Sequence, residues 1–375
     1  MSIAQISLDC VFHFLNGKSP RPSSDGEFPI YGSNGKIGFS KEHNHERSIV
    51  IGRVGAYCGS VEVCESKFWG SDNTIILKPK DGHNLKYWFY RLKSYPLGNY
   101  SGGAAQPLLT QKTLKPIKIN SHQIESEQFR IAEILSTYDD LIDNSTKRIG
   151  LLEKSACLLF REWFIRLQYP GHENANVKDG IPEGWTHGNV NDFYETASGG
   201  TPSRKNPDYF TGDINWVKTQ ELLDGYIFET DEKITEQAIS ESSAKIFPEN
   251  TVLVAMYGAT IGRLGILAKP SSTNQACCAL ITKHKDSNPF FAYLFLAENK
   301  QGLINLAQGA AQNNISQQVI RNYPMVLPAK NIMDAFVERV EPIFKLKQSL
   351  ELQIKNLATA RDLLLPRLMN GDITV

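Results

Sequence analysis

Basic and amide side chains recur around the glycine-rich turns of this sequence, and residues of these types could bind nucleic acid. Arginine and lysine bind phosphate or the acceptor edge of guanine, whereas glutamine and asparagine suit adenine. For each residue taken singly, a solvated surface side chain is the competing interpretation. The candidate contacts are Lys18, Arg21, Lys36, Arg53, Gln106, Arg204, Lys205, Lys218, Arg263, Gln312 and Asn313.

Residue patterns typical of catalysis are missing from the sequence. An adenine methyltransferase needs an N/D-P-P-Y/F motif, and the nearest strings, at Asn206–Tyr209 and Asn288–Phe291, each lack the second proline. There is no GxxxxGK[ST] phosphate loop, and the glycines of Gly258–Gly265 have the spacing of a tight structural turn. The histidines form no HExxH pair, and Asp208 and Asp213, which could begin a nuclease cluster, have no counterpart in the first half. We therefore expect no catalytic residue, metal site or cofactor on this chain.

Composition favours a globular protein of a reducing compartment. The 375 residues are 41% hydrophobic, and the 6 cysteines form no CxxC pair. No apolar run approaches the ~18 residues that a membrane span requires, and the N-terminus lacks the pattern of a secretion signal. We expect a soluble, cytoplasmic chain with reduced thiols.

The sequence contains one order of motifs twice. The first copy runs through NGKSP, IVIGRVGAYCGSV, SDNTIIL and GAAQPLLTQKTL, and the second through SGGTP, VLVAMYGATIGRL, STNQACCAL and GAAQNNISQQVI. Most matching motifs lie about 200 residues apart, which is far longer than the repeat of a solenoid or propeller. The second copy is longer, mainly between Thr211 and Phe247. The pattern predicts a duplicated domain, each copy followed by a helix.

Each copy begins with short β-rich runs and an aromatic helical segment, which predicts an α+β fold. The β-rich runs are Ile49–Ile51, Asn73–Leu77, Val252–Ala255 and Cys278–Thr282, and the helical segments are Leu85–Leu92 and Pro289–Ala297.

Each copy ends in a predicted long amphipathic helix. The first apolar stripe comprises Ile134, Tyr138, Leu141, Ser145, Ile149, Leu152, Ala156, Leu159 and Trp163, and the second comprises Ile343, Leu346, Leu350, Ile354, Leu357, Arg361, Leu364 and Leu368. Neither helix has enough chain around it to bury its stripe, so we predict that the two pair in antiparallel sense, coiled-coil-like and with pseudo-twofold symmetry. In that pairing Ile149 and Leu152 face Ile354 and Leu357. The alternative is two unrelated helices, each packed on its own domain.

Together these features resemble the specificity (S) subunit of type I restriction-modification systems. The resemblance rests on the duplicated layout and on five motifs in a fixed order: RIAEILSTYDDLID at Arg130–Asp143, IPEGW at Ile181–Trp185, SGGTPSRKNPDYF at Ser198–Phe210, GAAQNNIS at Gly309–Ser316 and LLLPRLMNGDI at Leu363–Ile373. The first half departs from the pattern, because it lacks a Gly-Trp start and carries NGKSP in place of SGGTP.

The resemblance implies two target-recognition domains, residues 1–128 and 169–331, each reading one half of a split DNA site. It also implies that a central helix, 129–168, and a C-terminal helix, 332–375, separate these domains and dock two methyltransferase subunits. Restriction subunits would join that core. The expected S-adenosylmethionine, ATP and magnesium would then lie on the partner subunits.

Net charge argues against a stand-alone DNA-binding protein, because 40 basic residues are balanced by 40 acidic ones. The conflict is resolved if partner subunits supply much of the phosphate contact. Two other interpretations stay open at this point: a coiled-coil scaffold or adaptor, and a self-contained DNA modification enzyme. A scaffold does not need two similar domains with different polar loops, and the enzyme lacks its motifs.

Overall fold

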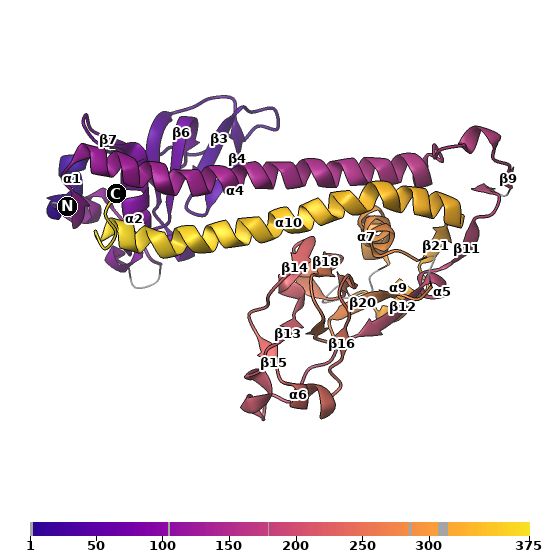
Figure 1. Ribbon diagram of the computed structural model, residues 1–375. Helices are drawn as coiled ribbons and strands as arrows, with labels where there is room; N and C mark the ends of the chain where they lie inside the picture. Colours follow the sequence, from indigo (N-terminus) through magenta and orange to yellow (C-terminus); the bar gives the residue numbers. More distant parts are fainter. Residues whose placement is uncertain (1–2, 104–105, 179, 285–286, 307–313) are drawn as a thin grey trace. The chain divides into compact units, whose positions relative to one another are not determined.

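The computed structural model describes residues 3–103, 106–178, 180–284, 287–306 and 314–375. The chain divides into two compact units, one formed by residues 1–143 with 356–375 and the other by residues 144–355. Two long helices, α4 (Glu125–Phe160) and α10 (Lys330–Met369), each contribute a segment to both units (Figure 1). We call residues 1–143 with 356–375 the first unit and residues 144–355 the second unit.

A six-stranded sheet forms the body of the first unit. In spatial order its strands are β2 (Phe12–Asn16), β7 (Thr74–Pro79), β5 (His45–Gly52), β6 (Val61–Gly70), β3 (Phe28–Gly32) and β4 (Gly35–Ser40). All neighbours are antiparallel except β3 and β6. Beside it, β1 (Ile3–Ser7) pairs with β8 (Lys118–His122), and α1 (Leu8–Val11) follows β1. The helix α2 (Leu85–Lys93) follows Asn84, whose side chain caps its first turn.

The second unit has a five-stranded sheet and an additional four-stranded one. The first sheet has the order β12 (Tyr194–Ser198), β20 (Cys277–Thr282), β17 (Val252–Ala255), β18 (Leu264–Leu267) and β14 (Gly225–Ile227). The other has the order β15 (Lys233–Ile234), β13 (Ile214–Val217), β19 (Ser271–Thr273) and β16 (Ile246–Phe247). Two short pairs complete the unit: β11 (Thr186–Asn189) with β21 (Pro324–Leu327), and β9 (Val177–Lys178) with β10 (Ile181–Pro182).

Equivalent strand orders in the two units confirm the predicted duplication and the α+β class. The order β2-β7-β5-β6 corresponds to β12-β20-β17-β18. The strand β3 corresponds to β13, because Tyr31 pairs in parallel with Gly70 as Val217 pairs in parallel with Thr273, and Gly70 and Thr273 accept equivalent hydrogen bonds from Lys18 and Gly200. The helix α7 (Pro289–Glu298) is capped by Asn288, as α2 is by Asn84. The extra length of the second copy forms β14 to β16 and the short helix α6 (Glu236–Ser240), so it enlarges this unit without changing the shared frame.

In the first unit, the start of α4 runs antiparallel to the end of α10. Ile131 and Leu135 of α4 share one apolar cluster with Leu365 and Leu368 of α10. The same cluster includes Trp88 of α2, which is completely buried. The helix pair therefore closes the core of this unit.

In the second unit, the remaining helix segments also run antiparallel. Glu153 pairs with Lys347, and the ring of Phe160 lies 6.2 Å from that of Phe336, so residue numbers rise along one helix as they fall along the other. After Phe160 the helix α4 continues as one π-helical segment, Arg161–Ile165. Phe290 of α7 stacks on Phe344 of α10 at 4.6 Å, which joins the pair to the body of the unit.

Part of the predicted apolar stripe is wrong. Leu141 and Leu346 were assigned to the inward face, but both side chains are exposed in the structure. Ser145 and Leu350 are buried as expected. The four predicted packing residues Ile149, Leu152, Ile354 and Leu357 are half-buried, and their contact with one another stays a prediction. Within the described residues, no helix is both long enough and apolar enough to cross a membrane.

Candidate nucleic-acid interface

Motifs that are distant in sequence meet at one corner of the sheet in the first unit. The turn 16–21 follows β2, the arc 53–59 follows β5, residues 71–74 precede β7, and residues 106–111 lead into α3 (Gln111–Leu114). The side-chain amide of Gln111 donates to the Asn16 side chain at 2.8 Å. Gly55 N–H donates to the Pro107 carbonyl at 3.1 Å, and Lys18 N–H donates to the Gly70 carbonyl at 2.9 Å. We call these four segments the first loop corner.

The duplicated motifs meet in the same way in the second unit. Gln317, at the start of α9 (Gln317–Arg321), accepts a hydrogen bond from the Ser198 hydroxyl at 2.9 Å and donates to the Thr196 carbonyl at 2.8 Å. Ile315 N–H donates to the Met256 carbonyl at 2.9 Å. The second loop corner comprises residues 198–204, 256–263, 273–276 and 314–317, and each segment has its counterpart in the first corner.

Close backbone contact explains why glycine follows Asn16 and Ser198 in the two turns. A Cβ atom on Gly17 would lie 1.8 Å from the Ser71 carbonyl oxygen, and one on Gly199 would lie 2.1 Å from that of Thr273. Neither position has room for a side chain. The motifs NGKSP and SGGTP of the sequence therefore mark where the chain packs against the backbone of Ser71 in the first unit and of Thr273 in the second.

Most candidate contacts of the first half lie on or beside the first loop corner. Lys18 and Arg21 are exposed on its turn, and Gln106 is exposed beside the arc. Arg53 is half-buried, and its backbone is held by hydrogen bonds to Asn73 and Leu109. Lys36 lies on β4 with its ammonium 3.9 Å from the centre of the Phe39 ring.

The candidate contacts of the second half differ strongly in exposure and pairing. Lys205 and Arg263 are exposed, whereas Lys218 is largely buried and forms an ion pair with Glu232 at 3.1 Å. Gln312 and Asn313 lie outside the described residues.

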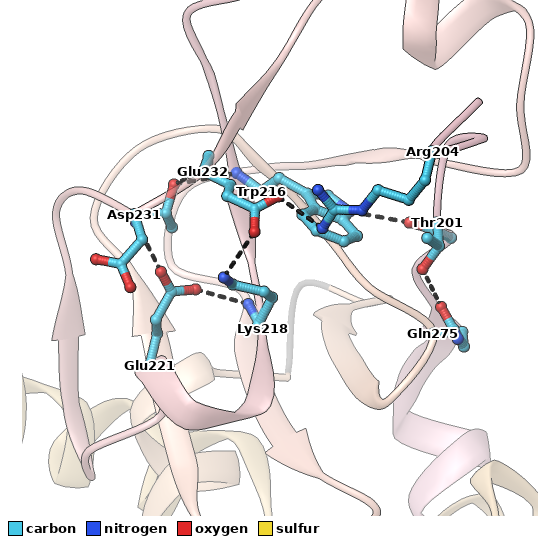
Figure 2. A network of polar contacts seen from close by, with 10 residues as sticks. Thr201, Arg204, Trp216, Lys218, Glu221, Asp231, Glu232 and Gln275 are labelled. Atoms are coloured by element: carbon cyan, nitrogen blue, oxygen red, sulfur yellow. Dashed lines mark hydrogen bonds and ion pairs between the residues drawn. The ribbon is translucent and has the colours of Figure 1, made fainter. Parts of the chain in front are cut away.

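Arg204 has several partners within the unit. Its guanidinium carbon lies 4.1 Å from the centre of the Phe210 ring and 5.3 Å from that of Trp216. It also forms an ion pair with Glu232 at 2.7 Å, as Figure 2 shows. Burial alone raises the pKa of the Glu232 carboxyl, but the contacts with Lys218 and Arg204 outweigh it, so the pKa lies below its usual value. Glu232 is therefore a stable anion between two candidate contacts.

A comparison with known protein families agrees with this duplicated arrangement. The family model described as type I restriction modification DNA specificity domain matches residues 5–154 and 182–360. The chain belongs to this family. It is a type I restriction-modification specificity subunit, the component that recognises the DNA sequence.

Individual relatives and one solved structure point the same way. The chain is 26% identical over 374 residues to the MjaIX specificity subunit of Methanocaldococcus jannaschii, covering 95% of this chain and 86% of that one. It is 24% identical over 330 residues to the HindI specificity subunit of Haemophilus influenzae, covering 71% of each. A crystal structure of an S subunit from M. genitalium covers 98% of this chain and 96% of its own, with a TM-score of 0.68 at 16% identity, and so shares the fold.

Sequence reasoning missed the partners that position the basic residues of this specificity subunit. Trp69 and Trp216, Glu42 and Glu232, and Gln111 and Gln317 were not among its candidates. The two glutamines could have been found, because each follows the duplicated Thr or Ser that caps the next helix. The tryptophans and glutamates stand at unrelated places in the two copies, so motif alignment could not find them.

Within the described part of the chain, no group of three or more His, Cys, Asp or Glu side chains could hold a metal ion. The chemistry available at the two loop corners is hydrogen bonding by amides and ion pairing by guanidinium and ammonium groups. Both interactions suit the recognition of a nucleic acid.

Proposed function

We propose that this specificity subunit reads a bipartite DNA site, one half with each loop corner. It presents that site to two methyltransferase subunits for adenine methylation, or to restriction subunits for cleavage. The chain itself is non-catalytic and holds no cofactor. S-adenosylmethionine, ATP and magnesium act on the partner subunits, and the complex works in the cytoplasm.

One observation carries the proposal: the same set of motifs builds the same corner twice, but presents different side chains each time. Gln111 ties the first corner to Asn16, and Gln317 ties the second to Ser198. On these shared frames, the arc following Gly55 carries Tyr57 and Ser60 where the arc following Gly258 carries Thr260 and Arg263. A shared frame with different polar groups is what reading two different half-sites requires.

The decisive experiment is methylation-sensitive sequencing of DNA from cells that express this chain with its methyltransferase partner. We expect one methylated motif with two specified halves and an unspecified gap. Gln106→Ala should relax base preference only in one half, and Arg263→Ala only in the other, because each lost base contact costs about 1–3 kcal/mol. Lys178→Ala is the matched control, because Lys178 is equally exposed but lies on β9, outside the corner.

Two results would contradict the proposal. One is a methylated motif without two separate specified halves. The other is a loss of preference at both halves when only Gln106 or only Arg263 is changed.

A further inference from the structure

An arginine, a tryptophan and a glutamate form a compact group beside the second loop corner. The indole N–H of Trp216 donates to the Gly200 carbonyl at 2.9 Å, which fixes the ring against the turn. The guanidinium of Arg204 lies over that ring and contacts Glu232 at 2.7 Å (Figure 2). The Arg204 side chain nevertheless remains 55% exposed. The ring therefore orients a cation that still has a face open to solvent.

The first loop corner has the same three-residue group. The indole N–H of Trp69 donates to the Lys18 carbonyl at 3.0 Å. Lys18 and Gly200 occupy equivalent places, because each follows the glycine that packs against the neighbouring strand. Arg21 lies 5.9 Å from the centre of the Trp69 ring and forms an ion pair with Glu42 at 3.2 Å.

The tryptophans and glutamates come from different parts of the two copies. Trp69 is near the end of β6, whereas Trp216 is on β13, the counterpart of β3. Glu42 precedes β5, whereas Glu232 directly precedes β15. Duplication would have placed these residues at equivalent positions, so it does not explain the recurrence. A shared requirement to hold the arginine in one position explains why both groups contain a tryptophan and a glutamate.

The exposed ion pair between Arg21 and Glu42 contributes little to the fold. The side chains of Arg21 and Glu42 are 72% and 62% exposed, and exposed pairs are screened by solvent. A carboxylate and a phosphate present similar oxygens to the planar guanidinium fork. One oxyanion can therefore replace the other without loss of the arginine's position on its ring.

We propose that Glu42 and Glu232 are internal stand-ins for DNA phosphate: each holds its arginine on the tryptophan in the free protein and is displaced by a backbone phosphate when DNA binds. This inference rests on the proposed function, and it assigns Arg21 and Arg204 to backbone contact rather than to base reading. It is consistent with the absence of net positive charge, because each of these two arginines is neutralised by its own glutamate until DNA arrives.

The test measures binding of the full chain to a labelled mixed-sequence duplex over a series of salt concentrations. Phosphate contacts are independent of sequence, so the target site is not needed. The variants are Glu232→Gln, Arg204→Ala and the two combined. Glutamine keeps the shape of glutamate and one acceptor oxygen, which can face Lys218 or Arg204 but not both, because the two cations contact different oxygens of Glu232. It removes the charge without leaving a cavity, so folding should persist. Asp231→Asn is the matched control, because it removes one negative charge at the neighbouring exposed residue.

We expect Glu232→Gln to tighten binding about two- to fivefold, which is the effect of removing a competing surface ion pair. Asp231→Asn should tighten it much less. Arg204→Ala should weaken binding and reduce the slope of log K against log salt by about 1, the value for one lost phosphate contact. In the Arg204→Ala background, Glu232→Gln should no longer tighten binding. Glu42→Gln and Arg21→Ala should behave in the same way and provide a second, more exposed test pair.

Equal effects of Glu232→Gln and Asp231→Asn would overturn the inference, as would a gain that survives removal of Arg204 or an unchanged salt slope in Arg204→Ala. These results leave the proposed function standing, because they concern the backbone contact alone. A wild-type chain that binds no duplex even at low salt would also overturn the inference, whereas the proposed function is tested separately by the methylated motif of the complex.

Discussion

The two units attach the paired helices to their sheets in different ways. In the first unit, Arg361 of α10 pairs with Asp139 of α4, and Asp139 accepts a hydrogen bond from Tyr90 of α2 at 2.5 Å. In the second unit, the Lys347 ammonium contacts Glu153 at 2.7 Å and the Asp224 carbonyl at 2.9 Å. The Arg361 side chain is 16% exposed, but that of Lys347 is only 3% exposed.

The enlarged region of the second unit explains this difference. The strand β14, which begins the enlarged region and forms the edge of the five-stranded sheet, contacts α10 directly. The Tyr226 N–H donates to the Glu351 carboxylate at 2.7 Å. Burial raises the pKa of Glu351, and Lys347, the nearest cation, opposes that rise. Lys347 therefore holds together the helix pair and the strand that borders the enlarged region. A duplicated frame can thus accept a long insertion if a buried polar contact ties it to the helices.

Removing Lys347 should have the largest effect on this comparison. Lys347→Ala leaves Glu351 without its cation in a buried site, so we expect the free energy of unfolding of the second unit to fall by about 3 kcal/mol. Arg361→Ala should cost the first unit about 1 kcal/mol, because water can reach that site. Hydrogen exchange resolved by segment measures the two units separately. Lys345→Ala, on an exposed side chain of the same helix, is the control. Equal losses for Lys347→Ala and Arg361→Ala would show that burial does not distinguish the two junctions.

The two loop corners should differ less. Gln317 forms two side-chain hydrogen bonds, to Ser198 and Thr196, whereas Gln111 forms one, to Asn16 at an exposed site. We expect Gln317→Ala to destabilise the second unit by about 1–2 kcal/mol and Gln111→Ala to cost the first about 0.5 kcal/mol. Denaturant titration followed by segment-resolved exchange would measure both. A larger loss for Gln111→Ala would reverse the order and refute this account of the corners.

Acid should affect the first unit through its histidines, with the smallest effect of the three. Burial lowers the pKa of His45, His83 and His122, and His122 is completely buried on β8. The unfolded chain binds these protons near pH 6.5, above the folded values, so the stabilisation is full above that pH and is lost as pH falls below it. In the second unit the position equivalent to His122 is occupied by Pro328, which cannot bind a proton, so this effect belongs to the first unit.

The measurement is the unfolding free energy of the first unit between pH 7 and 5.5, for wild type and His122→Gln. We expect wild type to lose about 1 kcal/mol more than the variant over this range. Burial raises the pKa of Glu62 in the same unit, which acts in the opposite direction, so the difference between the two proteins is the relevant quantity. Identical pH slopes would mean that His122 does not contribute.

The sequence alone determined the features that depend on neighbouring residues and on repetition. The strands β5 and β17 and the helices α2 and α7 were predicted, because runs of β-branched residues and aromatic helical segments are local patterns. The duplicated motifs also identified the family, since their order is a property of the chain. Part of the candidate site followed in the same way, because the turns carrying Lys18, Arg21 and Arg204 belong to those motifs.

Only the tertiary structure decided which of these residues have partners. The spacing of Leu346 places it on the apolar stripe, but the residue is 40% exposed in the structure. The sequence predicts that Arg204 and Lys218 are both free to contact DNA. In the structure β13 pairs with β15, and Glu232, the residue before β15, lies between the two cations. Trp69 and Trp216 reach equivalent carbonyls from different strands. Such contacts join segments that are far apart in the chain, and local periodicity contains no information about which distant side chain will arrive.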